Sequence, residues 1–409
     1  MASLPAPMAA NPIHETGPLP LETLEGQGLQ WFVQGENHDY IPEEFIELHP
    51  TESQDLLHAS AVLFDYFVQA IQVVAREGRW SELHLPNHCI RLLQYSIERE
   101  LGNYLIGRFD FSGGLAQIPP RLIEFNGDTC SLLPETAFIQ EEYWEQERAE
   151  LPPGEPYNEL MVSLTERFEY LLERYPDREA TLLITTMGGD DDWLNADVIS
   201  EAAERAGFDE VHYADLQKVT FSPEEGIFLE VTPGNYLRFD FWYKMLPWDF
   251  FLFEEPELFA ILDRIVRQEL CIILNPAFAM LLQNKGLLKI IYELYPNAPE
   301  VLRAGRSAVD FPDQRFVSKP FFGRMGENIS LHDGQVVAKV KTEGDYGSNP
   351  MLYQELAPFY TDLEGHRYQP SVFWTGEASA ICIRRQDSLI IDDDAEFLCH
   401  IVAEKEEED

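Results

Sequence analysis

Two short stretches, Gly107-Arg-Phe-Asp-Phe-Ser-Gly-Gly and Arg121-Leu-Ile-Glu-Phe-Asn, indicate how the centre of this chain folds. Both alternate polar and apolar side chains, and the loop between them holds two glycines and the pair Pro119-Pro120. Alternating runs on either side of a Gly/Pro loop are typical of a β-hairpin. We therefore expect two antiparallel strands here, and the segments on either side determine the fold class.

The polar side chains of this hairpin are expected to share one face. Successive side chains of a strand point to opposite faces, so Arg108 lies with Asp110, and Glu124 lies with Asn126. Two carboxylates and an amide offer the oxygen ligands that suit Mg²⁺ bound together with the phosphates of a nucleotide. The alternative is a solvent-exposed face on an acidic protein.

The segments around the hairpin predict a mixed α/β (α+β) protein. Apolar residues recur at helical spacing between residues 50 and 102, which predicts a helical region before the hairpin. After it, a helix (160–175), a strand (180–186), a loop with two glycines, a helix (196–207) and a strand (210–213) form the pattern of a βαβ unit. An amphipathic helix interrupted at Gly286 follows, and mainly strands after residue 315.

The chain is strongly acidic. Its 409 residues include 29 Lys+Arg and 72 Asp+Glu, so the formal net charge is −43. Such a surface repels phosphate backbones and anionic lipids, so we expect neither nucleic acid nor a membrane as a partner. It also concentrates cations, including metal ions and polyamines. A hydrophobic fraction of 45%, with 12% aromatic residues, predicts a large core.

The cysteines and the amino terminus bear on the compartment. No CxxC pair and no HExxH sequence occurs, so a structural zinc site or a redox dithiol has no support. Apolar neighbours predict buried thiols in a reducing cytoplasm. The first residues lack the basic and apolar regions of a signal peptide, and charges interrupt the apolar stretch 239–258, so we expect a soluble cytoplasmic protein. The five cysteines are Cys89, Cys130, Cys271, Cys382 and Cys399.

Three further segments hold candidate binding residues. Lys319 precedes a loop with Gly323 and Gly326, where backbone N–H groups could approach phosphates, although a plain turn is the alternative. The loop lacks the following helix and the GK[ST] sequence of a P-loop. Lys285 is either a surface cation or one aimed into a cleft. Arg384, at the end of a predicted strand, is either an exposed strand end or a clamp for phosphate or an oxyanion.

Taken together, the motifs resemble the ATP-grasp synthetase module of glutathionylspermidine synthetase and its stand-alone relatives, the acid–amine ligases. The resemblance covers roughly residues 50–402, and six of the segments occur in the order that the family shows. The matching segments are GRFDF (107–111), LIEFNGDT (122–129), NPAFAMLLQNK (275–285), KPFFGRMGEN (319–328), YQELAP (353–358) and GEASAICIR (376–384), with LPWD (246–249) as a further echo.

The resemblance implies a site for ATP and two Mg²⁺ ions in a permuted ATP-grasp fold, in which the metal ligands precede the lysines. At matching positions, the implied metal ligands are Asp110, Glu124 and Asn126. The implied nucleotide residues are Lys285, Lys319, Gly323, Gly326, Gln354 and Leu356. Arg108 and Arg384 match the arginines placed at the acyl phosphate and the acid substrate. Looser matches to the acid or amine substrate site are Asp128, Thr129, Ser131 and Glu135.

The resemblance also divides the chain into six expected segments. The two ends are a flexible N-terminal extension (1–45) and an acidic tail (403–409). Between them we expect a helical region with the metal-binding palm (46–160), an α/β pre-ATP-grasp-like domain (161–270), a small β-rich lid with the nucleotide lysines (271–345) and the C-terminal part of the palm (346–402).

The implied reaction is ATP-dependent amide formation from a small-molecule or peptide carboxylate and an amine, such as a polyamine, through an acyl phosphate. Two alternatives are an ATP-grasp peptide ligase and a non-catalytic cation- or polyamine-binding protein with a relic nucleotide site. Bifunctional relatives carry an amidase domain ahead of this module, whereas residues 1–49 precede the match here, so we expect no hydrolysis of the product. Asn275 and Glu396 depart from the family pattern and leave both substrates open, and the oligomeric state is equally open.

Overall fold

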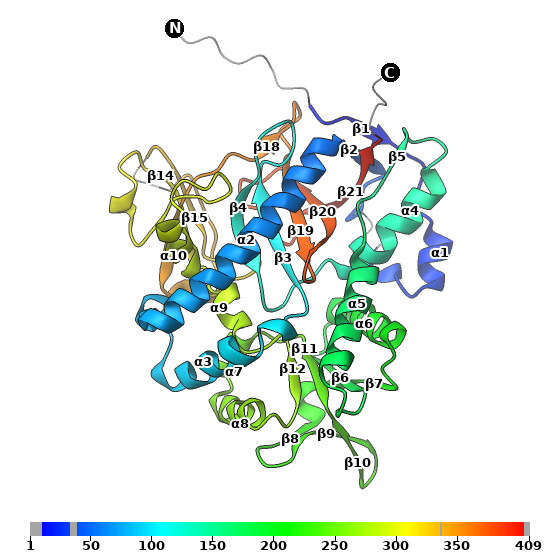
Figure 1. Cartoon of the computed structure of the whole chain (residues 1–409). Coiled ribbons are helices and arrows are strands. Elements are labelled where there is room, and N and C mark those ends of the chain that lie inside the picture. Colours follow the sequence, from blue (N-terminus) through cyan, green and yellow to red (C-terminus); the bar gives the residue numbers. More distant parts are fainter. Residues whose placement is uncertain (1–9, 33–38, 336–337, 405–409) are drawn as a thin grey trace.

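Four β-sheets organise the chain, which we describe from a computed structural model for residues 10–32, 39–335 and 338–404 (Figure 1). The largest sheet has nine strands in the order β1-β2-β21-β20-β19-β3-β4, with β5 and β18 paired outside this path. Its strands are β1 (Ile13–Glu15), β2 (Glu44–Leu48), β3 (Gly107–Ser112), β4 (Arg121–Asn126), β5 (Gly154–Glu155), β18 (Tyr360–Thr361), β19 (Arg367–Trp374), β20 (Ala378–Gln386) and β21 (Glu396–Ala403).

The expected hairpin is confirmed as β3 and β4, which pair antiparallel at one edge of this sheet. Arg108 lies opposite Asn126, and Asp110 lies opposite Glu124, so the four polar side chains do share a face. On the other face, Phe109 and Phe125 stack with their ring centroids 3.9 Å apart. The alternation of the sequence therefore separates an aromatic face from a charged one.

Helix α2 (Pro50–Glu77) covers the aromatic face and runs across the sheet in Figure 1. The ring of Phe67 lies 5.0 Å from that of Phe125, centroid to centroid. The helix ends at Gly78, which adopts a left-handed conformation, and a second helix, α3 (Ile90–Arg99), follows. Among the described helices, α2 alone is long and apolar enough to cross a membrane, but its buried residues belong to the core under the sheet.

The expected βαβ unit is confirmed within a parallel sheet of four strands, in the order β12-β11-β6-β7. Helix α6 (Asp190–Ala206) begins six positions earlier than expected, directly after Gly189. Helix α5 (Leu160–Arg174) packs against it. A three-stranded antiparallel sheet, β10-β9-β8, extends this domain and was not expected. The strands are β6 (Thr181–Thr186), β7 (Glu210–Asp215), β8 (Val219–Ser222), β9 (Gly226–Thr232), β10 (Asn235–Phe239), β11 (Phe241–Lys244) and β12 (Ile272–Leu274).

The fourth sheet has the strand order β13-β17-β14-β15-β16. Four of its five strands fall in the segment expected to be the lid, so we call it the lid sheet. The interrupted helix is observed as two helices, α9 (Ala279–Gln283) and α10 (Leu287–Leu294), which leave Lys285 in the break between them. The lid strands are β13 (Ala304–Gly305), β14 (Arg315–Pro320), β15 (Ser330–Asp333), β16 (Val340–Lys341) and β17 (Met351–Glu355).

Short helices connect these sheets. The domain built on the four-stranded parallel sheet is called the middle domain below. In it, α7 (Trp248–Phe253) and α8 (Pro256–Arg267) follow β11. Beside the large sheet, a π-helix, η6 (Glu135–Ile139), continues into α4 (Gln140–Glu147). The remaining described helices are α1 (Leu21–Gly26) and the 3₁₀ turns Gln30–Phe32, Arg79–Leu83, Asn87–Cys89, Leu101–Asn103, Leu216–Lys218, Ala308–Asp310 and Asp345–Ser348.

The structure departs from the expected segments in three places. The described part of residues 1–45 is not a flexible extension, because β1 pairs with β2 at the sheet edge and Asn11 hydrogen-bonds Glu47 and Glu52. Strand β17, expected in the palm, lies in the lid sheet, and β12, expected in the lid, pairs with β11. Residues 1–9 and 405–409, which hold the outer parts of the expected extension and tail, lie outside the described residues.

Candidate active site

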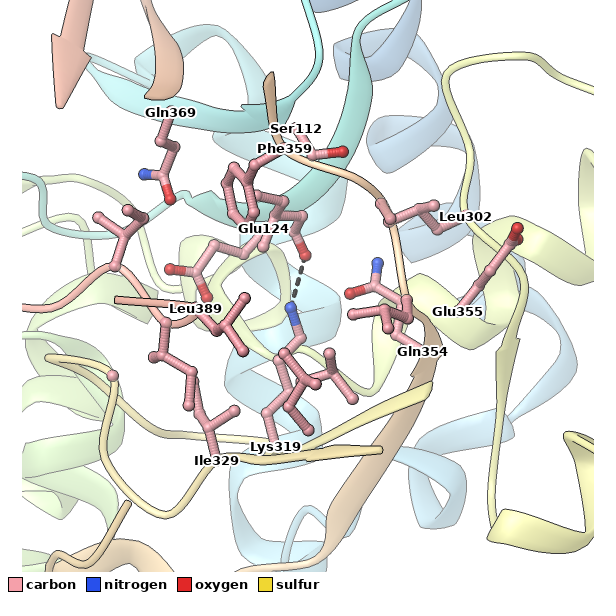
Figure 2. Close-up of a pocket in the computed structure, with 18 of the residues that line it drawn as sticks. Ser112, Glu124, Leu302, Lys319, Ile329, Gln354, Glu355, Phe359, Gln369 and Leu389 are labelled. Atoms are coloured by element: carbon pink, nitrogen blue, oxygen red, sulfur yellow. Dashed lines mark hydrogen bonds between the residues drawn. The ribbon is translucent and has the colours of Figure 1, made fainter. Parts of the chain in front are cut away.

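A cavity of about 330 Å³ lies between the lid sheet and the hairpin, a size typical of small-molecule sites. Figure 2 shows Glu124, Lys319 and Gln354 around this space, with Leu389 and Ile329 on its apolar side. Seven residues expected at the metal or nucleotide line the cavity, namely Glu124, Lys285, Lys319, Gly323, Gly326, Gln354 and Leu356.

Lys285 points into the cavity and not to the surface. Its ammonium group lies 3.1 Å from Oε2 of Glu124 and donates a 2.6 Å hydrogen bond to the carbonyl of Gly323. The break in the helix that carries it depends on Gly286, where a Cβ would lie 2.5 Å from the ring of Phe321. Close packing of the lid therefore requires glycine next to this lysine.

Lys319, near the end of β14, is the second buried cation. Its ammonium group donates a 2.7 Å hydrogen bond to the carbonyl of Ile123, next to Glu124. Burial and the charge of Lys285 lower the pKa of Lys319 to about 8, although Glu124 opposes the shift. A bound anion would favour the charged form of this lysine.

Three of the four polar residues of the hairpin form a hydrogen-bonded group, while Glu124 pairs with Lys285. Arg108 donates to both oxygens of Asp110 at 2.8 and 3.1 Å, and Asn126 donates to Asp110 at 2.9 Å. Burial raises the pKa of Glu124, but Lys285 and Lys319 outweigh burial and hold that pKa below its ordinary value. A carboxylate from each of two neighbouring strands, together with an amide oxygen, makes a donor set that fits Mg²⁺.

The loop after β14 is a close-packed part of the cavity. Gly326 has φ +68°, and a Cβ on it would lie 3.1 Å from Asp392 and 3.3 Å from Ile390. Residues 389–391 line the cavity opposite this loop, although their sequence carries no recognised motif. The signal that could have found them is a run of three apolar residues between Ser388 and the acidic residues that begin at Asp392.

The far end of the cavity is the expected adenine end. Gln354, on β17, lies opposite Val317 of β14, and Leu352 of the same strand lies opposite Lys319. The buried amide of Gln354 donates to the carbonyl of Leu122 at 3.1 Å. The paired strands β14 and β17 therefore carry Lys319 and the residue of the expected adenine pocket, Gln354, at neighbouring positions of the register.

Arg384 lies outside this cavity, and with Arg108, which we group with it as the arginine pair, it acts electrostatically on the buried Glu135. Arg384 lies within β20, two residues before its end, and not at the end as expected, and it donates to the carbonyl of Asp392. Together, Arg108 and Arg384 lower the pKa of Glu135, which burial raises to about 7. The structure thus divides the expected residues between the cavity and a neighbouring arginine pair.

Asp128, one of the looser matches to the substrate site, does not line the cavity. It is fully buried, its carboxylate lies 2.5 Å from the ammonium of Lys244, and it accepts a hydrogen bond from the backbone of Trp248. This pair joins the end of β4 to the middle domain, which is a structural role that the sequence did not indicate.

A family model described as glutathionylspermidine synthase preATP-grasp matches residues 13–403. The chain belongs to this family. The match spans both the large sheet and the lid, and it includes the β1 segment that precedes the motifs of the sequence. The resemblance drawn from those motifs is confirmed.

Two curated relatives carry ligase names. A protein of Haemophilus influenzae named as an acid–amine ligase is 27% identical over 287 residues, which cover 68% of this chain and 70% of that protein. Trypanothione synthetase of Crithidia fasciculata is 23% identical over 367 residues, which cover 82% of this chain. The chain spans only 53% of that synthetase. These comparisons support the expected enzyme class, an ATP-dependent carbon–nitrogen ligase.

A solved structure supports the fold class. A glutathione synthetase-like effector from Globodera pallida superposes with a TM-score of 0.52 at 9% sequence identity, covering 88% of this chain and 89% of the effector. At this identity the likeness bears on the fold alone. The mixed α/β architecture agrees with the expectation from the sequence.

Proposed function

We propose that this protein is an ATP-dependent carboxylate–amine ligase that forms an amide through an acyl phosphate, on a permuted ATP-grasp fold. The observation that carries the proposal is the meeting of Lys285, Lys319 and Glu124 in one cavity. Two buried ammonium groups from different elements face one carboxylate in this cavity, so an additional anion would balance the remaining positive charge. A triphosphate supplies such an anion, whereas two buried lysines would disfavour a bound cation at this place.

The nucleotide is proposed to lie along β14 and β17. Its base would occupy the end near Gln354 and Leu356, and its phosphates the end near the two lysines. The loop around Gly323 and Gly326 would cover the phosphates and exclude water, which protects a reactive acyl phosphate from hydrolysis.

The metal site is proposed at Asp110, Glu124 and Asn126. The carboxylates of Asp110 and Glu124 already pair with the cations Arg108 and Lys285, so this face of the sheet attracts positive charge. Mg²⁺ bound there would neutralise the phosphate oxygens. Arg108 and Arg384 would bind the carboxylate of the acid substrate. They would also stabilise the negative charge that develops on the transferring phosphoryl group.

The amine is proposed to be cationic and to enter beside Arg384. Asp191, at the start of α6, raises the pKa of Asp393, for which burial is the larger cause. These two acids come from different parts of the chain, and Arg384 acts on Asp393 by lowering its pKa. They offer a cationic amine a partner that a neutral amine does not need.

The names of the family and of trypanothione synthetase point to glutathione and spermidine as first probes of the two substrate sites. A peptide ligase is the second candidate, favoured by the departures Asn275 and Glu396 from the family pattern. All five cysteines are buried free thiols, which supports the proposed cytoplasmic location.

The test is ADP release across a panel of acids and amines, with mass spectrometry of the product. Lys319→Met should abolish ADP release with the best pair of substrates, because it removes a buried charge from the proposed phosphate site. Lys218→Met is the control, because Lys218 forms an exposed pair with Asp215 on the middle domain. An amide that Lys319→Met forms at the wild-type rate would refute the proposal.

A further inference from the structure

The arginine pair, Arg108 and Arg384, acts on the carboxyl group of Glu135, to which the proposed reaction has not yet given a role. Glu135 is the first residue of the π-helix η6, and its side chain is almost fully buried. One carboxylate oxygen accepts a 2.7 Å hydrogen bond from the hydroxyl of Tyr40. The other oxygen, Oε2, has no hydrogen-bond partner among the described residues. Single π-helical turns are frequent at functional sites.

The surroundings of Glu135 are charged on several sides. The charges of Arg108 on β3 and of Arg384 on β20 favour its ionised form, and Glu135 in turn raises the pKa of the Cys382 thiol on β20. Tyr40 donates its hydrogen bond from the segment before β2. Nε of Arg384 is likewise buried without a partner in the described structure. A carboxylate and a guanidinium that are both buried, each with an atom that lacks a hydrogen-bond partner, indicate a place for a polar ligand.

The acid is also able to change its charge near neutral pH. Burial raises the pKa of Glu135 to about 7, although Tyr40, Arg108 and Arg384 all favour the ionised form. A general base works best when its pKa lies close to the working pH. The carboxylate can therefore accept a proton in one step and release it to solvent after the product leaves.

We propose that Glu135 is the general base that takes a proton from the attacking amine, a role that rests on the proposed function. The amine nitrogen bonds to the acyl carbon, and the bond from that carbon to the phosphate oxygen breaks with its electron pair on phosphate. Of the three protons of the entering ammonium group, one stays in the amide, one goes to Oε2 of Glu135 and one leaves on the phosphate. A purely structural role, in which Glu135 only holds Tyr40 or the arginines, makes a different prediction.

The test separates the two half-reactions with glutathione, ATP and two nucleophiles. Hydroxylamine is mostly unprotonated at neutral pH and traps an acyl phosphate without a base, whereas spermidine must lose a proton. Glu135→Gln keeps an oxygen for Tyr40 but cannot accept the proton. We expect hydroxamate formation within about threefold of wild type, and spermidine amide formation lowered by about 10²- to 10⁴-fold at pH 7. The loss should shrink as pH rises and more of the amine is unprotonated.

Two further variants keep the proposal falsifiable. Glu135→Asp should recover part of the amide formation, because it restores a carboxylate. Glu141→Gln is the matched control, since burial raises the pKa of Glu141 as well, but its neighbours are Asn158 and other glutamates. If Glu135→Gln lowers hydroxamate and amide formation equally, or lowers neither, the role of Glu135 as a base is overturned and the proposed function stands. Wild-type protein that forms neither product with glutathione or with any other acid of the ADP-release panel overturns the proposed function and this role with it.

Discussion

Nη2 of Arg324, in the lid loop, lies 2.7 Å from each carboxylate oxygen of Asp249, which begins α7 on the middle domain. The carboxylate is nearly buried, and Nη1 of the same arginine reaches the hydroxyl of Tyr346 at 3.3 Å. Arg324 also lines the cavity, so this ion pair holds the lid loop against the middle domain beside the proposed phosphate site.

Asp249→Asn should loosen the lid loop, because it leaves Arg324 partly buried without its ionic partner. We expect the free energy of unfolding to fall by about 1–3 kcal/mol in urea titrations, and the KM for ATP to rise about tenfold. Asp263→Asn is the matched control, because Asp263 binds Arg267 through two oxygens within a single helix, far from the lid. Equal rises in KM for the two variants would contradict the role of this pair in the lid.

Glu124→Gln and Asn126→Ala should abolish turnover without unfolding the protein. Both side chains lie on the charged face of the hairpin, and their removal takes oxygen donors from the proposed metal site. We expect kcat to fall by at least about 10²-fold, with calorimetry showing weaker Mg²⁺-dependent binding of ATP. Glu224→Gln, on an exposed pair with Arg264, should leave both quantities unchanged. Near-wild-type turnover in either hairpin variant would remove the metal assignment.

Affinity for ATP should fall as pH rises through about 8, because the pKa of Lys319 has that value in the protein without nucleotide. Phosphate favours the charged lysine, so binding takes up a proton above this pH. Calorimetry in two buffers of different ionisation enthalpy should detect that uptake, at pH values where the triphosphate is fully ionised. Lys319→Arg should remove it, since arginine stays protonated. Proton uptake of the same size in the variant would assign it to another group.

The lowered pKa of Lys319 also affects the stability of the fold, which should change with pH in the opposite direction to the affinity for ATP. The native pKa of Lys319 is lowered from an unfolded value of about 10.5, so the unfolded chain binds more protons between pH 8 and 10.5. The contribution of this lysine is therefore least favourable below pH 8 and improves as pH rises. Chemical denaturation of wild type and Lys319→Met should differ most at neutral pH and converge toward pH 10.

Gly326→Ala should weaken ATP binding, and Gly326→Val should weaken it further. Both substitutions place a side chain on a residue with positive φ and crowd Ile390 and Asp392 across the cavity. Gly334→Ala separates these effects, because Gly334 has φ +75° but a Cβ on it would meet no atom of the described residues within 4 Å. We expect a similar loss of stability of about 1 kcal/mol in both alanine variants, and weaker ATP binding only in Gly326→Ala. Unchanged affinity would make this loop an ordinary turn.

The KM for spermidine should rise with ionic strength more steeply than that for a neutral amine. The net charge of −43 and the acids beside Arg384 attract a cation over a distance that falls from ~10 Å at 0.1 M salt to ~3 Å at 1 M. Asp191→Asn should raise the spermidine KM severalfold and leave ATP binding unchanged. Equal salt dependence for both amines would favour the peptide-ligase alternative.

The sequence by itself determined the hairpin and its charged face. Strand side chains alternate with a period of two, so the positions of Arg108, Asp110, Glu124 and Asn126 follow from the local pattern once the strands pair. The βαβ unit was readable for the same reason, because its strands and helices bury faces with regular spacing. The sequence also made Gly326 a candidate, because a closely packed loop restricts which residues its own positions can hold.

Only the tertiary structure decided which charges meet. Lys285 faces the cavity because Gly286 lets Phe321 pack against the break in its helix, a contact between segments 35 residues apart. Arg324 and Asp249 are 75 residues apart, and the edge strand β1 is too short to carry a periodic signal. The pKa of Glu135 depends on burial and on arginines from two other strands. Burial and charge depend on distances in space, and a single sequence contains only the order of the residues along the chain.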